Sequence, residues 1–286
     1  MKRIAVLGST GMAGHVVSAY LEEHSYMVFR ASRSEKSTAF RRAVDVTDFT
    51  ALGAWLDEVW PDTVINCVGL LQKACETRPD RAVLINSYLP RFLEQRSAEG
   101  KGRVIHLSTD CVFSGKRGSY REDDFPDGDT MYDRSKALGE IKNGRDLTFR
   151  MSIIGPDIDP KGTGLFNWFM AQTGKIHGYA KTIWNGVATI ELARAIDAAL
   201  EQDLTGLYHL SSAESVSKYH LLQLFQQEFS RDDISVREVD GLLLDKSLVN
   251  TRSDFSFEMR DYPHQIADMR RWIEIHHELY PHYHFQ

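Results

Sequence analysis

Residues 3–14 read Arg-Ile-Ala-Val-Leu-Gly-Ser-Thr-Gly-Met-Ala-Gly, an apolar run that passes directly into a glycine-rich turn. Glycines let the backbone turn tightly, and the N–H groups at the start of a following helix can bind a pyrophosphate. The spacing Gly-x-x-Gly-x-x-Gly is one residue wider than the commonest dinucleotide-binding pattern. Its place after an N-terminal buried strand predicts a dinucleotide-binding turn, with a turn that binds nothing as the alternative. The residues expected to line it are Gly8, Thr10, Gly11, Met12 and Gly14.

Short apolar runs alternate with helical patterns over the first 155 residues. The expected strands are residues 3–7, 27–31, 43–45, 63–68, 103–107 and 147–152. The expected helices are residues 12–23, 49–59, 80–98 and 131–143. Strands separated by helices of this length predict a parallel sheet covered on both faces, with right-handed crossovers. The expected fold class is therefore α/β, a Rossmann-type doubly wound sheet.

The character of the chain changes after Gly155, where prolines and glycines mark a loop. A helix at 190–202 and a strand at 206–210 are expected to return to the sheet, and a smaller mixed cap is expected to end in a helix at 263–279. The predicted division is a dinucleotide-binding domain over residues 1–155, to which 186–211 return, and a mainly substrate-binding cap over 156–286.

Composition and charge exclude several classes of protein. The 286 residues include 34 Lys plus Arg and 40 Asp plus Glu, a net charge of −6, so neither nucleic acid nor anionic lipid is expected as a partner. The longest apolar run, residues 64–71, is too short to span a bilayer, and no signal peptide is predicted. Three cysteines without zinc-like spacing predict no metal site and indicate a reducing cytoplasm. The histidines near the C-terminus are expected to lie in a solvated tail.

The residues after the second expected strand indicate which of two dinucleotides, NAD or NADP, would bind. An acidic side chain there binds the ribose 2′-hydroxyl of NAD, whereas an arginine accommodates the 2′-phosphate of NADP. Ser32 and Arg33 come first and favour NADP(H), while Glu35 keeps NAD(H) open. Asp45 and Val46, at the end of the third strand, are expected near the adenine, with a helix N-cap in this region as the alternative.

A tyrosine and a lysine stand one helical turn apart at Tyr132 and Lys136. Positions i and i+4 share a helix face, and a neighbouring ammonium lowers the pKa of a tyrosine, which is ordinarily near 10. Ser108 and Thr109 follow the fifth expected strand, at the sheet edge where doubly wound folds bind ligands. A hydroxyl there can bind a substrate carbonyl while the tyrosine protonates it.

These features, in this order, resemble the extended short-chain dehydrogenase/reductase family, and within it the dTDP-4-dehydrorhamnose reductase-like proteins. Ser-Thr-Asp-Cys-Val-Phe-Ser-Gly (108–115) is similar to a motif of that group, as are residues 132–140 and 150–155. Asn66-Cys67-Val68-Gly69 and Asn86 also fit. Two departures are Cys111, where the group has an aromatic residue, and residues 186–189, which lack a proline.

The resemblance implies NADPH-dependent reduction of a 4-keto sugar attached to a nucleoside diphosphate. Tyr132 would donate the proton, Lys136 would lower the pKa of the tyrosine and hold a cofactor ribose, and Thr109 would orient the carbonyl. The family also implies a homodimer. Further cofactor contacts are expected at Cys67, Val68 and Gly69, and substrate contacts at Asp110, Cys111, Arg150 and Trp184.

Several alternatives stay open at this point. A strand-end cap for Asp110, a salt bridge for Arg150 and core packing for Trp184 are each compatible with the sequence. A nucleotide-sugar 4-epimerase needs only the same Tyr, Lys and hydroxyl. Cys111 replaces the glutamate of sugar 4,6-dehydratases, which disfavours dehydration. A non-catalytic regulatory subunit is the third alternative, because the β subunit of methionine adenosyltransferase resembles the same reductases.

Overall fold

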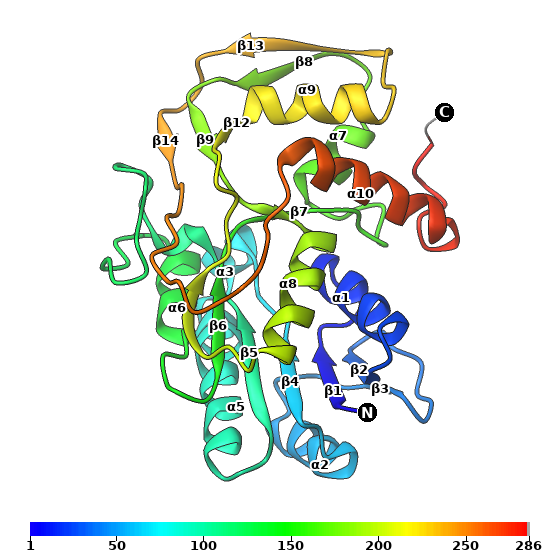
Figure 1. Ribbon diagram of the computed structural model, residues 1–286, viewed down its shortest axis with the longest axis vertical. Helices are drawn as coiled ribbons and strands as arrows, with labels where there is room; N and C mark the ends of the chain where they lie inside the picture. Colours follow the sequence, from blue (N-terminus) through cyan, green and yellow to red (C-terminus); the bar gives the residue numbers. More distant parts are fainter. Residues whose placement is uncertain (285–286) are drawn as a thin grey trace.

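A seven-stranded parallel sheet forms the centre of the computed structural model, which describes residues 1–284 (Figure 1). Its strand order is β11-β6-β5-β4-β1-β2-β3, and every neighbouring pair is parallel. This confirms the predicted Rossmann-type doubly wound fold. The strands are β1 (Arg3–Leu7), β2 (Met27–Ser32), β3 (Arg41–Ala43), β4 (Thr63–Asn66), β5 (Arg103–Leu107), β6 (Leu147–Arg150) and β11 (Gly206–His209).

Helices cover both faces of this sheet. Side chains alternate along β1, so Ile4 and Val6 join the apolar cluster of α1 and α8, while Ala5 and Leu7 join that of α2 and α5. The helices are α1 (Met12–Glu23), α2 (Phe49–Val59), α3 (Gln72–Thr77), α4 (Pro79–Ala82), α5 (Leu89–Ala98), α6 (Met131–Gly139) and α8 (Thr189–Glu201).

Element boundaries differ from the expected ones at several places. The helix expected at 80–98 is α4, a π-helical segment Val83–Tyr88 and α5 in succession, preceded by α3, which was not predicted. β3 lies two residues earlier than expected, and α6 ends at Gly139 because Glu140 has extended backbone angles.

The cap contains more strands than the sequence indicated. A parallel pair joins β8 to β13, and β9 pairs with β12 and β14; with α9, the β8–β13 pair lies at the top of Figure 1. β11 returns to the central sheet beside β6, while the division into two domains stays a prediction. The remaining elements are β7 (Ile153–Ile154), α7 (Leu165–Met170), β8 (Gly174–Tyr179), β9 (Thr182–Trp184), β10 (Val187–Ala188), β12 (Val216–Ser217), α9 (Lys218–Glu228), β13 (Ile234–Val239), β14 (Leu244–Asp245) and α10 (Tyr262–Ile275).

The C-terminal segment is only in part the expected solvated tail: His277 and His284 are exposed, whereas Tyr280 and Tyr283 pack against the fold. The hydroxyl of Tyr280 is hydrogen-bonded to His15 in α1 over 2.7 Å and accepts from Trp272. Tyr283 donates to Asn167 in α7. Trp272, Tyr280 and Tyr283 are buried, so burial of their apolar rings holds this segment against the fold. Among residues 1–284 no helix combines the length and apolar character needed to cross a bilayer.

Candidate active site

The glycine-rich turn brings the start of α1 against the end of β1. Gly8 has φ +78°, and its carbonyl accepts a hydrogen bond from the N–H of Gly11 over 2.9 Å. A Cβ on Gly14 would lie 2.1 Å from the Gly8 carbonyl oxygen, whereas a Cβ on Gly11 would meet nothing nearer than 3.4 Å. Gly14 therefore serves close packing, and Gly11 borders open space.

The start of α1 has features of an anion site. Among residues 1–284 no side chain caps this helix, and no acidic residue lies in its first turn, so its N–H groups and positive dipole end are available to a phosphate. The hydroxyl of Thr10 donates to that of Ser32 over 3.0 Å, which ties the turn to the end of β2. Met12 faces the loop after β7, where a Cβ on Gly164 would lie 3.0 Å from its sulfur.

Two residues of opposite charge follow β2 beside this turn. Arg33 is exposed, and Glu35 accepts a hydrogen bond from the hydroxyl of Ser9 over 2.9 Å. The carboxylate therefore lies against the turn itself, while the arginine remains accessible to solvent. Both residues that bear on the choice between NADP and NAD are thus at the expected sheet edge.

Asp45 and Val46 lie just beyond β3. The side chain of Asp45 accepts hydrogen bonds from the N–H and the hydroxyl of Thr47, and these bonds lower its pKa. The helix N-cap belongs to Asp48, whose side chain accepts from the N–H of Ala51. Val46 is buried and packs in the apolar cluster that α2 also joins.

The end of β4 lies directly beside the glycine turn. A Cβ on Gly8 would lie 3.1 Å from a methyl group of Val68 and 3.2 Å from the carbonyl carbon of Cys67. A Cβ on Gly69 would lie 4.0 Å from the Lys136 Nζ. The predicted cofactor residues after β1 and β4 therefore share one edge with the lysine of α6.

Lys136 is buried and held by the end of β5. Its Nζ donates to the carbonyl of Leu107 over 2.7 Å, and burial lowers its pKa to about 8. Within the described part of the chain this is the one hydrogen bond of the ammonium, which leaves its other two N–H donors for a ligand. Burial also raises the pKa of Cys67 to about 12, so this thiol is not a nucleophile at neutral pH.

Tyr132 and Thr109 meet at the carboxyl end of β5. Burial raises the pKa of the Tyr132 phenol, and a hydrogen bond with the Thr109 side chain opposes that shift. The structure does not show the expected lowering of this pKa: burial raises it, and the Lys136 ammonium donates to the carbonyl of Leu107. A protonated phenol can donate a proton but is a poor base at neutral pH.

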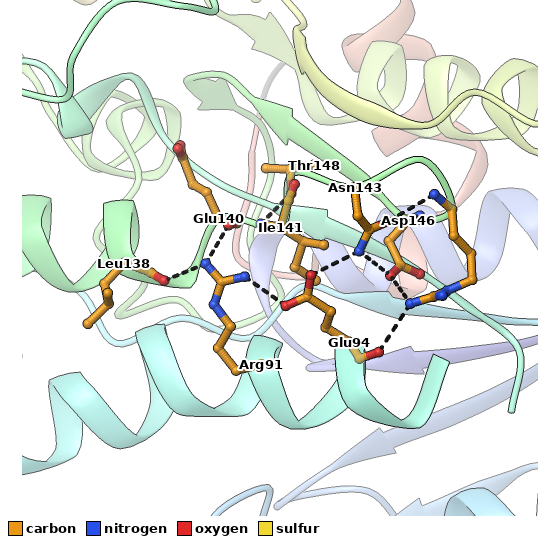
Figure 2. Close-up of polar contacts among 9 residues, drawn as sticks. Arg91, Glu94, Leu138, Glu140, Ile141, Asn143, Asp146 and Thr148 are labelled. Atoms are coloured by element: carbon orange, nitrogen blue, oxygen red, sulfur yellow. Dashed lines mark hydrogen bonds and ion pairs between the residues drawn. The ribbon is translucent and has the colours of Figure 1, made fainter. Parts of the chain in front are cut away.

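Hydrogen bonds at both ends hold α6, and with it Tyr132 and Lys136. Thr130 and Asp133 form a reciprocal capping box at its N-terminus. At the other end, Arg91 of α5 donates to the carbonyls of Leu138 and Glu140 (Figure 2). The same figure shows the polar side chains that continue this network toward β6, namely Glu94, Asn143, Asp146 and Thr148.

Arg150 does not contact substrate, which corrects that expectation. Its side chain has no exposed surface, and its Nε and Nη2 donate to the two carboxylate oxygens of Glu140 over 2.8 and 2.6 Å. Its Nη1 lies 2.8 Å from His209 Nε2, and Ser108 donates to the same glutamate. The alternative of a salt bridge at the sheet edge is what the structure contains.

Trp184 is part of the core rather than an open stacking surface. It is 3 % exposed, its ring centroid lies 5.5 Å from that of Tyr262, and a Cβ on Gly186 would lie 2.4 Å from its ring. The absence of a larger residue at 186 thus has a packing reason. The expectation that Trp184 contacts substrate directly is wrong, because protein atoms cover its ring.

Asp110 and Cys111 follow Thr109 in a short 3-10 turn. The Thr109 hydroxyl donates to the Asp110 carboxylate over 3.2 Å and accepts from the Cys111 N–H over 3.1 Å. Burial raises the pKa of Asp110, and the charges of Lys246 and Lys218 oppose this rise. Burial also raises the pKa of the Cys111 thiol, to about 12.

Lys218 and Lys246 were not predicted from the sequence. They come from α9 and from the residue after β14, more than 100 positions away from Asp110 in the chain. No motif or spacing marks them as partners of this turn. Their proximity depends on how the cap folds over the sheet edge.

The chain belongs to the family of the RmlD substrate binding domain, whose model matches residues 1–157. This confirms the resemblance drawn from the motifs. Methionine adenosyltransferase 2 subunit beta of Xenopus tropicalis is 23% identical over 252 residues, 83% of this chain and 75% of the relative. The dTDP-4-keto-6-deoxy-D-glucose reductase of Streptomyces niveus is 26% identical over 246 residues, 83% of this chain and 82% of the relative.

Solved structures share this fold over nearly the whole chain. A hypothetical dTDP-4-dehydrorhamnose reductase from Sulfolobus tokodaii has a TM-score of 0.76 and 26% identity, covering 91% of this chain and 97% of that one. The dTDP-4-dehydrorhamnose reductase of Bacillus anthracis in complex with NADP has a TM-score of 0.79 and 19% identity, covering 95% of this chain and 99% of that one.

Proposed function

We propose that this member of the RmlD substrate binding domain family is an NADPH-dependent reductase of a 4-keto nucleoside-diphosphate sugar. The observation that carries the proposal is the meeting of Tyr132 and Thr109 at the end of β5, with Lys136 beside Gly69 of the neighbouring strand end. Similarity to enzymes named as reductases of 4-keto deoxysugar nucleotides supports the substrate class.

The residues present fit a bound dinucleotide. The uncapped start of α1 and the open space at Gly11 would accept the pyrophosphate. Lys136 would hold a ribose with its remaining N–H donors, and the exposed Arg33 would bind a 2′-phosphate. The NADP complex of a structural neighbour supports the preference for NADP(H), and Glu35 beside the turn leaves NAD(H) as a weaker cofactor.

Two side chains, Thr109 after β5 and Tyr132 in α6, would act on the substrate carbonyl. When bound, the reduced nicotinamide supplies the hydride. In the substrate complex the Thr109 hydroxyl would turn from the Asp110 carboxylate to the keto oxygen and donate its hydrogen bond there, and Tyr132 would donate the proton that the oxygen needs. Burial keeps the phenol protonated at neutral pH, and general acid catalysis of this kind contributes about 10²–10⁴-fold.

A screen of NADPH oxidation with 4-keto sugars on dTDP, UDP and GDP tests this function. The wild-type chain should oxidise NADPH with at least one of them. Tyr132→Phe should lose about 10²–10⁴-fold in kcat while NADPH affinity stays unchanged. Tyr88→Phe is the matched control, because Tyr88 is half-exposed on the π-helical segment and should behave as wild type. Near-normal turnover by Tyr132→Phe would remove the proton-donor role.

The same assay separates two other functions. A 4-epimerase would interconvert two nucleotide sugars without net NADPH oxidation, which chromatography of the products detects. Similarity to methionine adenosyltransferase 2 subunit beta favours a regulatory subunit as the second candidate. That function would leave every sugar unreduced and would retain a protein partner in a pull-down, with Tyr132→Phe retaining it equally well.

A further inference from the structure

The segment after α10 (residues 276–284) lies against the first residues of α1. The hydroxyl of Tyr280 is 2.7 Å from His15 Nε2, and the two rings meet edge to face with their centroids 5.6 Å apart. His15 Nδ1 is in turn 2.9 Å from the carbonyl oxygen of Gly11, in the glycine-rich turn. Both rings are buried. One side chain therefore connects the segment after α10 to the turn that is expected to bind a pyrophosphate.

The hydrogen bonds of this connection have only one consistent direction. A carbonyl oxygen can only accept, so His15 Nδ1 carries the proton and donates to Gly11. His15 Nε2 then accepts from the hydroxyl of Tyr280, which itself accepts from the indole N–H of Trp272 over 2.9 Å. Burial lowers the pKa of His15 to about 4, so the ring is neutral at neutral pH and keeps this acceptor. Removal of the Tyr280 hydroxyl would take away the donor of a buried nitrogen.

The orientation of the Gly11 carbonyl bears directly on the anion site. Its oxygen accepts from both the backbone N–H and the imidazole of His15, over 3.0 and 2.9 Å. The carbonyl of Gly11 and the N–H of Met12 belong to one planar trans peptide, so they point in opposite directions. Because the carbonyl points along α1, the N–H of Met12 points out of the helix N-terminus. The contact with His15 thus holds an N–H group that a pyrophosphate would meet.

A second hydroxyl of the same segment holds the loop at residues 157–164. Tyr283 accepts from the N–H of Asp157 over 2.9 Å and donates to the side-chain oxygen of Asn167 over 2.8 Å. The amide nitrogen of Asn167 donates to the carbonyl of Gly162 over 2.7 Å. Tyr283 and Asn167 are buried. The loop is therefore bound to Tyr283 directly at its start and through Asn167 near its end.

We propose that Tyr280 and Tyr283 are positioning residues for the dinucleotide, which hold the glycine-rich turn and the loop at 157–164 in the arrangement that binds its pyrophosphate. The inference rests on the dinucleotide site of the proposed function. The turn and the loop are neighbours, because a Cβ on Gly164 would lie 3.0 Å from the sulfur of Met12. Each hydroxyl acts through a buried partner, and a site that is already ordered binds more tightly because binding has less order to impose.

Titration calorimetry with NADP⁺ measures this effect. Tyr280→Phe and Tyr283→Phe keep the buried rings and remove only the hydroxyls, and each should weaken NADP⁺ binding by about 3- to 10-fold. Tyr208→Phe is the matched control, because Tyr208 is buried on β11, four strands away from β1, and its hydroxyl accepts from Asn250. This control also loses a buried hydrogen bond, so its thermal midpoint should fall while its NADP⁺ affinity stays at the wild-type value.

Amide hydrogen exchange gives a readout that lost stability alone would not produce. If the segment after α10 raises the affinity for NADP⁺, then NADP⁺ must stabilise the segment by the same factor. In the wild-type chain, saturating NADP⁺ should slow exchange at residues 8–14 and also at residues 276–283. In Tyr280→Phe at saturating NADP⁺, the protection at 8–14 should remain and the protection at 276–283 should be smaller.

The outcomes separate this inference from the proposed function. If the wild-type chain binds NADP⁺ and both phenylalanine variants bind it equally well, the positioning role is wrong and the reductase stands. An equal loss of affinity in Tyr208→Phe would also overturn the role, since it would assign the effect to general stability. If the wild-type chain binds neither NADP⁺ nor NAD⁺, the dinucleotide site fails, and the proposed function and this inference fail with it. Weaker binding confined to Tyr280→Phe and Tyr283→Phe, with reduced protection at 276–283, supports the inference.

Discussion

The ammonium of Lys136 donates to the backbone carbonyl of Leu107, the last residue of β5, over 2.7 Å. This bond joins the middle of α6 to the sheet one residue before Ser108 and two before Thr109. It holds a cation at the end of the strand whose next residues carry the hydroxyls. The carboxylate of Glu140 is the charged group that favours its ammonium form at neutral pH.

Cofactor affinity should depend on the charge of Lys136. Its pKa is about 8, so the ammonium is present below this pH and is lost as the pH rises through it. We expect NADP⁺ affinity to fall between pH 7 and 9.5, measured by calorimetry. Lys136→Met should bind NADP⁺ more weakly at pH 7 and show no such fall. A wild-type affinity that is constant up to pH 9.5 would contradict the ribose contact.

Two glycines of the first turn should respond differently to an added methyl group. Gly14→Ala places a Cβ 2.1 Å from the Gly8 carbonyl oxygen, so it should destabilise the fold by about 1–3 kcal/mol or more. Gly11→Ala has room for its Cβ, with 3.4 Å to the nearest atom, and should unfold near the wild-type midpoint. Gly11→Ala should nevertheless bind NADP⁺ more weakly, because the methyl group occupies space beside the helix N-terminus. Equal NADP⁺ affinity would show that the pyrophosphate does not approach there.

Arg33 should determine the preference for NADPH over NADH. A charge-assisted hydrogen bond to a phosphate contributes about 1.5–3 kcal/mol, so Arg33→Ala should lower NADPH affinity roughly 10- to 100-fold and leave NADH affinity nearly unchanged. Thermal shift titrations with both cofactors measure this. Arg237→Ala, exposed on β13, is the control. A parallel loss for both cofactors would assign Arg33 to the stability of the loop instead.

The buried pair of Glu140 and Arg150 should matter for stability. Glu140→Gln leaves a fully buried guanidinium without its counter-charge, and urea unfolding should show a loss of about 3–5 kcal/mol. The exposed pair of Arg42 and Glu58 provides the comparison, where Glu58→Gln should cost less than about 1 kcal/mol.

The same pair predicts how stability changes with pH. Burial opposes ionisation of Glu140, but the hydrogen bonds and charge of Arg150 hold its pKa below the usual value. The pair therefore stabilises the folded chain above the unfolded pKa of about 4.3, and this contribution is lost as the pH falls through the lower folded pKa. Glu140→Gln should lack that acid-dependent component in urea unfolding at pH 3–6.

Local patterns were sufficient to predict the sheet and the position of its ligand edge. The spacing of the three glycines predicted a tight turn, and at Gly8 and Gly14 only glycine allows the observed approach of helix to strand. The alternation of apolar runs and helical patterns predicted a parallel sheet covered on both faces, since buried strands need helices on both faces. The four-residue interval between Tyr132 and Lys136 predicted that both lie on one helix face, because residues four positions apart are neighbours on an α-helix.

Long-range packing decided the rest. Whether Arg150 faces a ligand or a glutamate depends on Glu140, the residue directly after α6, and on His209 in β11. The pKa of Tyr132 depends on burial, which no short stretch of sequence specifies. Lys218 and Lys246 come to the turn after β5 only when the cap folds, because side chains far apart in the chain share no periodicity that could mark them as neighbours.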